Sequence, residues 1–293
     1  MAVYNFGSVN IDHVYTLPHL PAPGETLGAT SHTVGLGGKG VNQSVAAAKA
    51  GSQVWHIGAI GVRDGWVRER MEGYGVDCTC LREVAGDTGH AMICVDAAGE
   101  NSIVIAAGAN VNQDRDFVLS AIGRAGAGDT LLLQNETDLQ PDAAAAALAK
   151  GMRVIYSAAP FSVGAVRAVL PHVTMLVMNA VEAEQLCTAT GMDLDRIPVP
   201  EVLVTLGAKG AMWRSNRTGE EIEVAAPRVT PVDTTAAGDT FIGYVAAGLD
   251  LGMPIRAAME WAGRAAALKV TRHGTADAIP SAADVRDFRV SPS

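Results

Sequence analysis

The chain has 293 residues, of which 48 % are hydrophobic and 18 % are charged, so it can form a large buried core and is not expected to be disordered. Its formal net charge of −9 disfavours nucleic acid or an anionic membrane as a partner. A nucleotide remains compatible with this charge, because backbone N–H groups can hold phosphates.

The N-terminus and the cysteines indicate a cytoplasmic protein. The first ten residues lack the basic and apolar regions of a signal peptide, and no run of about 18 apolar residues predicts a membrane span. The cysteines form no C-x-x-C pair, which is typical of reduced thiols.

Up to residue 110, core elements alternate with two exposed β regions. The expected core elements are strands at 3–9 and 53–61, and helices at 41–51 and 65–76. The β regions cover 13–36 and about 80–108, and the second is predicted to be a hairpin with its turn at 96–101. Because both regions interrupt an otherwise alternating β/α chain, we expect them to meet in one small sheet.

After residue 110 strands and helices alternate regularly. The expected strands are 129–134, 153–158, 175–179 and 201–207, and the expected helices are 112–125, 141–151, 162–170, 180–190, 239–251 and 254–271. This order predicts an α/β fold, a single domain over 1–293 whose doubly wound, mostly parallel sheet has helices on both faces. Ligands of such sheets bind at the carboxyl ends of the strands. Candidate residues at these ends are Asn10, Asp12, Glu136, Asn179 and the segment 205–210.

The segment "GLGGKG" (35–40) matches the dinucleotide fingerprint G-x-G-x-x-G, but its context does not. The preceding strand lies in an exposed β region, and the next core strand ends in glycine where an acidic residue is required. A Walker A loop is excluded, because Thr33 and Gly40 stand at two of its obligatory positions. What remains is a Gly-rich entry to a helix with Asn42 in its first turn, or simply a tight turn.

Two similar stretches place small residues before an aspartate, "GAGD" at 126–129 and "AAGD" at 236–239. An apolar run of strand type follows Asp129, so we interpret the first stretch as a turn. Apolar residues recur at helical spacing after Asp239, which puts 236–238 at a helix N-terminus, where free N–H groups suit an anion. Asp239 is therefore either a catalytic base or only an acid that caps the helix.

Several segments together resemble a known family: "GGKGVNQSVAAAKAG", "AGAN", "LLLQNE", "LVTLGAKG" and "DTTAAGDTF". In this order they are similar to the ribokinase-like PfkB family of sugar and nucleoside kinases, over about residues 5–280. The resemblance implies a doubly wound α/β domain with a β lid, formed here from 13–36 and about 80–108. In this family the lid often pairs with that of a second subunit, which implies a homodimer.

The resemblance also implies a reaction, transfer of the γ-phosphate of ATP to the primary 5-hydroxyl of D-ribose. Asp239 would be the general base, and the N–H groups of Ala236, Ala237 and Gly238 would form an anion hole. The residues implied to bind the sugar are Asn10, Asp12, Gly38, Asn42 and Glu136, with Lys39 supporting the loop.

Nucleotide and cation sites are implied in the same way. Thr205, Gly207 and Gly210 would border the nucleotide, and Asn179 and Glu182 match an N-x-x-E motif that positions Mg²⁺ through water. The residues implied to hold an activating K⁺ are Asp233 and the carbonyls of Thr235, Lys269, Arg272 and Gly274.

Three positions depart from the family pattern. Ala278 stands where a serine cation ligand is common, "SAAP" (157–160) replaces "NPAP", and Ala180 replaces a common glutamate. These departures leave Asp239 untouched and bear on the need for K⁺ and on the choice of sugar.

The carboxylates Asp12, Glu136 and Asp239 would repel a phosphorylated sugar, which favours a neutral one. The alternatives within the family are another unphosphorylated sugar, such as a ketose or a deoxysugar, and a nucleoside. With aromatic residues at 5 %, the sequence offers no evident slot for a nucleobase. Outside the kinases of this family, the alternatives are a non-catalytic sugar-binding or regulatory relative and a nicotinamide enzyme.

Overall fold

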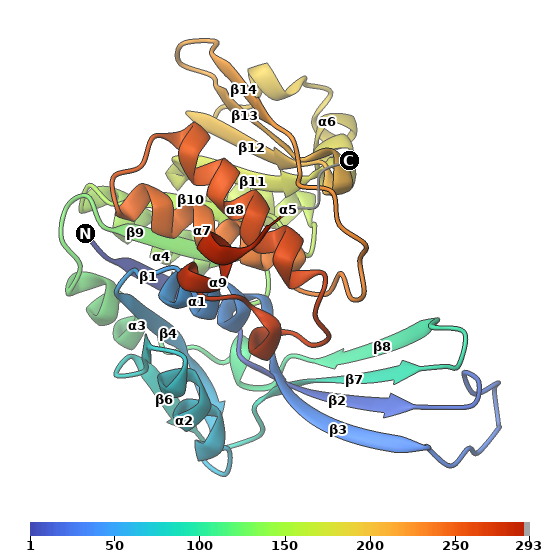
Figure 1. Ribbon diagram of the computed structural model, residues 1–293. Coiled ribbons are helices and arrows are strands. Elements are labelled where there is room, and N and C mark those ends of the chain that lie inside the picture. Colours follow the sequence, from blue (N-terminus) through green and yellow to red (C-terminus); the bar gives the residue numbers. More distant parts are fainter. Residues whose placement is uncertain (290–293) are drawn as a thin grey trace.

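The computed structural model describes residues 1–289, which form two sheets. The large sheet has ten strands in the order β14-β13-β12-β11-β10-β9-β1-β4-β5, with β6 paired to β4. Figure 1 shows helices on both faces of this sheet, while the small sheet, of order β3-β2-β7-β8, extends away from it. The predicted fold class is confirmed.

The large sheet is parallel from β5 through β12 and antiparallel at the end formed by β13 and β14. Its strands are β1 (Val3–Phe6), β4 (Val54–Gly61), β5 (Val76–Asp77), β6 (Leu81–Val84), β9 (Thr130–Gln134), β10 (Arg153–Ser157), β11 (Met175–Asn179), β12 (Glu201–Thr205), β13 (Ala211–Ser215) and β14 (Glu221–Val224). The hairpin of β13 and β14 was not anticipated, since neither strand follows the β/α alternation.

The first eight α-helices lie close to their predicted ranges, whereas the short helix near the C-terminal end was not predicted. The helices are α1 (Lys39–Lys49), α2 (Gly65–Gly73), α3 (Arg115–Gly123), α4 (Gln140–Ala149), α5 (Val163–Val169), α6 (Ala180–Thr190), α7 (Ala237–Asp250), α8 (Ile255–Lys269) and α9 (Ala282–Asp287), with 3₁₀ turns at Gly108–Val111, Leu170–His172, Leu194–Arg196, Gly207–Lys209 and Ala276–Ala278. Across residues 1–289, the structure contains no helix with the length and apolar character that a membrane span requires.

The small sheet combines both exposed β regions, through β2 (Asn10–Thr16), β3 (Ser31–Gly37), β7 (Gly89–Val95) and β8 (Asn101–Ala106). Its second part begins at Gly89, whereas the sequence suggested about residue 80. The physical reason is burial: Leu81 and Val84 of β6 are buried, and this strand pairs with β4 in the large sheet.

Two hydrophobic clusters sandwich the large sheet, because successive strand residues point to opposite faces. In β9, Leu132 belongs to the cluster under α1, α7 and α8, whereas Leu131 and Leu133 belong to the cluster under α3 to α6. All three leucines are fully buried. This rigid core fixes the carboxyl ends of the parallel strands, where the candidate residues lie.

Candidate active site

Asp239 lies in the first turn of α7, directly against α1. Its Oδ2 accepts a hydrogen bond from Asn42 Nδ2 (3.2 Å), and its Oδ1 accepts one from Gln43 Nε2 (3.0 Å). The two helices can approach this closely because Gly243 has no side chain: a Cβ there would lie 2.6 Å from the carbonyl oxygen of Gln43. Packing of α1 on α7 therefore fixes the carboxylate of Asp239 from two sides.

The N-terminus of α7 begins with an unusual backbone conformation. Ala236, its N-cap, is left-handed with φ 58°, and no side chain caps the helix. Thr240 Oγ1 donates to the Ala236 carbonyl (2.8 Å) and Ala237 N donates to the Thr234 carbonyl (3.2 Å), while Gly238 is exposed. These contacts hold the turn in place and leave the helix end open toward the cavity described below.

Asn10 and Asp12 lie at the start of β2, and glycines make room for both. A Cβ on Gly37 would lie 2.0 Å from Asp12 Oδ2, and one on Gly89 would lie 2.5 Å from Asn10 Oδ1. Burial, together with the nearby carboxylate of Glu136, raises the pKa of Asp12 from 3.8 to about 6. Asp12 is thus a buried carboxyl group beside a second one.

Glu136 follows β9 and accepts hydrogen bonds from Ser8 Oγ and from Lys39 N (3.0 Å). The left-handed φ of Gly38, 91°, lets the chain turn into α1 so that Lys39 N can reach this carboxylate. Burial lowers the pKa of Lys39, but the carboxylates of Asp239, Glu136 and Glu182 outweigh that effect and raise it. The Lys39 ammonium is therefore surrounded by acidic groups.

Sequence reasoning missed two residues that hold the predicted ones. Asn110 Nδ2 donates to Asn10 Oδ1 (2.8 Å), and Asn110 Oδ1 accepts from Val9 N (2.9 Å), so Asn110 orients Asn10. Gln43 holds Asp239 and is itself held by Gln134 Nε2, which donates to Gln43 Oε1 (2.7 Å). Both Asn110 and Gln43 lie inside the quoted family segments, and that is the only signal by which they could have been found.

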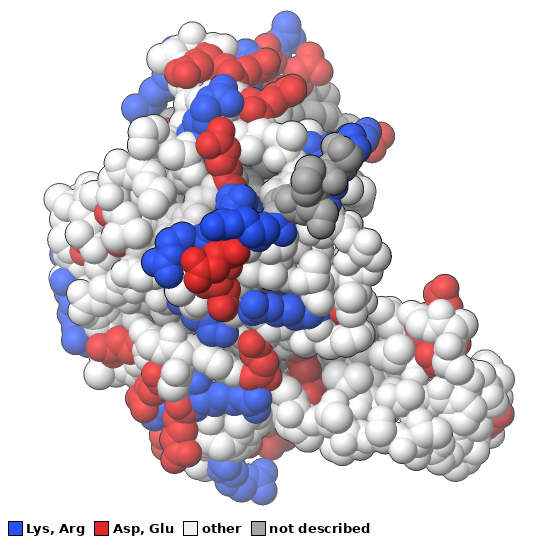
Figure 2. Space-filling view, in the orientation of Figure 1, with Lys and Arg blue, Asp and Glu red and all other residues white. Residues whose placement is uncertain are grey.

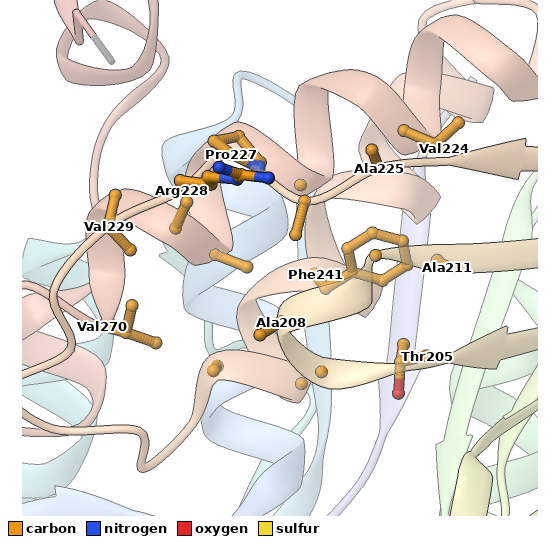
Figure 3. Close-up of a pocket in the computed structure, with 18 of the residues that line it drawn as sticks. Thr205, Ala208, Ala211, Val224, Ala225, Pro227, Arg228, Val229, Phe241 and Val270 are labelled. Atoms are coloured by element: carbon orange, nitrogen blue, oxygen red, sulfur yellow. The ribbon is translucent and has the colours of Figure 1, made fainter. Parts of the chain in front are cut away.

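A cavity of about 560 Å³ opens beside the N-terminus of α7. Its mostly apolar lining includes Ala237, Gly238 and all of Thr205, Gly207 and Gly210. Figure 3 shows the segment 224–229 along one side of this cavity, with Ala208 facing it from the other. Gly210 is required here by the fold as well, since a Cβ would lie 1.9 Å from the carbonyl oxygen of Val224.

Asn179 and Glu182 form a capping box at the start of α6 and are not part of the cavity lining. Glu182 N donates to Asn179 Oδ1 (2.9 Å), and Asn179 N donates to Glu182 Oε2 (2.8 Å). These contacts are a sufficient structural reason for both residues. In the described part of the chain, no group of three or more His, Cys, Asp or Glu side chains is arranged to hold a metal ion.

The residues expected around K⁺ do come together, with one difference. Asp233 Oδ1 accepts from Thr235 N (2.9 Å) and Oδ2 accepts from Gly274 N (2.9 Å). Lys269, of which only the carbonyl was considered from the sequence, sends its side chain to this point, and Nζ donates to the Asp233 carbonyl (3.1 Å). The guanidinium of Arg272, whose carbonyl was the expected ligand, lies 3.5 Å from Asp284 of α9.

Asp129 lies in a turn at the amino end of β9, the opposite edge of the sheet from Asp239. Its Oδ1 accepts from Ala2 N (2.9 Å) and its Oδ2 from Gly126 N (2.8 Å). The two stretches that look alike in sequence are thus in unrelated surroundings.

Comparison with known proteins identifies the family. The sequence model of the pfkB family of carbohydrate kinases matches residues 2–282. The chain is 33 % identical to a ribokinase of Haemophilus influenzae, over 96 % of both chains, and 32 % identical to a deoxyribokinase of Salmonella typhi, over 98 % of both. The structure of Arabidopsis thaliana ribokinase complexed with ribose and ATP superposes with a TM-score of 0.86 at 28 % identity, covering 99 % of this chain and 100 % of that one. The chain therefore belongs to the pfkB family, among its ribokinase-like sugar kinases, and is a phosphotransferase that acts on a sugar hydroxyl.

Proposed function

We propose that the protein is an ATP-dependent ribokinase that phosphorylates the 5-hydroxyl of D-ribose. The observation that carries the proposal is the position of Asp239: its carboxylate is fixed by Asn42 and Gln43 at an open helix N-terminus that borders the large cavity. A base, an anion site and a nucleotide-sized cavity thus lie side by side.

In the proposed reaction, Asp239 takes the proton of the sugar hydroxyl as its oxygen attacks the γ-phosphorus of ATP. The new O–P bond forms while the bond to the β-phosphate oxygen breaks, so the products are ribose 5-phosphate and ADP. The N–H groups of residues 236–238 and the positive end of the α7 dipole stabilise the negative charge on the transferred group.

The sugar is proposed to lie between Asp239 and the start of the small sheet. Asn10, Asp12 and Glu136 supply hydrogen-bond acceptors for several hydroxyls, and Gly38 and Asn42 line the near side. The carboxylates of this pocket favour a neutral sugar over a phosphorylated one. We propose ribose and not another sugar as the substrate, because ribokinases are among the most similar relatives.

ATP is proposed to occupy the cavity of about 560 Å³. Its apolar walls suit an adenine ring, and Gly207 and Gly238 let backbone approach the nucleotide. This places the phosphates at the N-terminus of α7, as in other nucleotide sites built on helix N-termini.

Mg²⁺ would be held chiefly by the phosphates and water, with Glu182 as an outer partner. This fits the structure, because Glu182 is half-buried, lies near Lys39 and has one carboxylate oxygen engaged by Asn179 N, and Mg²⁺ in nucleotide sites keeps several waters. The ion supplies neutralisation of the phosphate charge.

The small sheet is proposed to act as a lid over the sugar and to pair with the lid of a second copy. Both faces of β7 and β8 expose apolar side chains, with Met92 and Val104 on one face and Ile103 and Ile105 on the other, each about half exposed or more. Figure 2 shows few charged side chains on the visible face of this sheet. Light scattering after size exclusion would test the dimer, and a monomer that remains fully active would contradict it.

The function is tested by ADP release with Mg²⁺ over a panel of ribose, deoxyribose, fructose, other pentoses and nucleosides, with Asp239→Asn as the blank. Ribose should give the highest kcat/KM. A deoxyribose preference would support the second candidate, which the similarity to a Salmonella deoxyribokinase favours. No activity on any member would overturn the proposal.

A further inference from the structure

Lys269 is a fully buried lysine beside the proposed active site. It is the last residue of α8, its side chain is 0 % exposed, and its Nζ donates to the Asp233 carbonyl at 3.1 Å. The same Nζ lies 3.9 Å from Asp233 Oδ1. Buried lysines are rare unless they are paired, and the partner of this ammonium is Asp233.

The residues at this point do not fit the monovalent cation that the family resemblance implies. Both carboxylate oxygens of Asp233 already accept backbone N–H groups, and the Lys269 carbonyl accepts from Arg272 N (2.9 Å). Ala278 offers no side-chain oxygen. A second positive charge next to the fixed ammonium would also be repelled.

We propose that Lys269 replaces the monovalent cation, so that the positive charge at the Asp233 loop is part of the chain and catalysis needs no K⁺. This inference rests on the proposed kinase function of the site. A lysine ammonium suits the task, because it is a compact monovalent charge with three donors.

The hydrogen bonds around Asp233 connect this charge to the N-terminus of α7. The Asp233 carbonyl binds Lys269, and Thr234, the next residue, accepts from Ala237 N (3.2 Å) at the proposed anion hole. The Asp233 carboxylate also binds Gly274 N, and Thr275 Oγ1 donates to the Leu36 carbonyl of β3 (2.7 Å). Asp233 therefore joins the loop before α7 to the loop after α8, which Thr275 links to the base of the small sheet, and the Lys269 ammonium lies at this junction.

The test compares wild type with Lys269→Ala, which removes the ammonium and leaves room for a monovalent ion beside Asp233. Activity is measured from zero to high KCl, with tetramethylammonium chloride keeping the ionic strength constant. Wild type should change less than about twofold. The variant should lose about tenfold or more without K⁺, since Asp233 is left without its buried partner, and should recover with K⁺ or NH₄⁺.

A second measurement is independent of the kinase reaction. The melting temperature of Lys269→Ala should rise with the concentration of K⁺, because binding to the folded state stabilises it, whereas that of wild type should not respond specifically. This outcome would support the inference even if the panel of sugars gave no activity, so the two proposals can fail separately.

Lys49→Ala is the matched control. Lys49 is partly buried, and its Nζ donates to the Ile279 carbonyl (2.7 Å) of the neighbouring loop. It should melt at a lower temperature than wild type and show no K⁺ dependence. The inference is overturned if wild type is strongly activated by K⁺, or if the two variants respond to K⁺ alike. The wild-type titration alone is decisive if Lys269→Ala does not fold.

Discussion

Asp129 and Asp239 follow nearly the same residues in the sequence and have opposite surroundings in the fold. Asp129 accepts two backbone N–H groups, from Ala2 and Gly126, and so closes a turn. Asp239 accepts two side-chain amide groups from another helix, those of Asn42 and Gln43. The first carboxylate binds local backbone, whereas the second is positioned by tertiary packing next to Gly238, which lines the cavity.

The comparison shows what a short motif can and cannot predict. Small residues before an aspartate allow a tight backbone in both places, but the next element decides the outcome. A strand after Asp129 leaves no helix N-terminus, while α7 after Asp239 provides one. Function follows from the element behind the motif and from the partner helix in front of it.

Replacing Asp239 should have the largest effect on activity. Asp239→Asn removes the proposed base but keeps the side-chain shape, so kcat should fall about 10³-fold while ribose binding changes little. Steady-state kinetics and calorimetric titration with ribose would measure the two quantities. A variant that keeps more than a tenth of the wild-type kcat would contradict the role of Asp239 as base.

Most of the fold that supports this site could be predicted from the sequence. The β/α alternation after residue 110 gave the parallel sheet, and the two exposed β regions gave the small one. The assignment of Leu81–Val84 failed because local alternation does not reveal which sheet a short strand joins. The β13–β14 hairpin was not predicted for a related reason. Its first strand extends the large sheet by pairing antiparallel with β12, and local sequence does not reveal this partner.

Replacing Asp12 should have the next largest effect. Asp12 contrasts with the other two aspartates, because no group within residues 1–289 donates a hydrogen bond to its carboxylate. Its folded-state pKa of about 6 lies above the usual 3.8, so its contribution to stability is complete below about pH 4 and is lost as pH rises through 6. At pH 7.5 the free energy of unfolding of Asp12→Asn should therefore exceed that of wild type by roughly 2–3 kcal/mol. Near pH 4 the two proteins should be equally stable.

Urea unfolding of Asp12→Asn and wild type at the two pH values would measure this difference. The same variant should bind ribose more weakly, since an acceptor in the proposed pocket becomes a donor. Equal stability of the two proteins at pH 7.5 would contradict the buried, unneutralised state of Asp12.

Gln43 tests whether the amide contacts make the difference between the two similar stretches. Gln43→Leu removes the donor to Asp239 Oδ1, so kcat should fall about tenfold with little change in the KM for ribose. Gln134→Leu is the control, because Gln134 holds Gln43 without touching Asp239 and should have a smaller effect. Equal losses in the two variants, or a loss confined to KM, would argue against a positioning role for Gln43.

Such supporting residues are the part of the site that sequence reasoning could not supply. Gln43, Asn110 and the side chain of Lys269 act on other residues, and their partners lie from 36 to 196 positions away in the chain. A residue type that suits a ligand can be recognised in a motif, whereas a residue that orients another one becomes evident only when the helices are packed.

Asp129→Asn should have the smallest effect and completes the comparison. An asparagine keeps one acceptor oxygen, so it can bind the N–H of Ala2 or that of Gly126 but not both, and the turn should lose about 1 kcal/mol of stability. Because this turn lies at the amino end of β9, kcat and KM should stay within about twofold of wild type. Urea unfolding and the ADP-release assay would measure both. If Asp129→Asn proved inactive while folded, the two stretches would have been assigned the wrong way round, because a carboxylate that only closes a distant turn has no means of slowing the transfer.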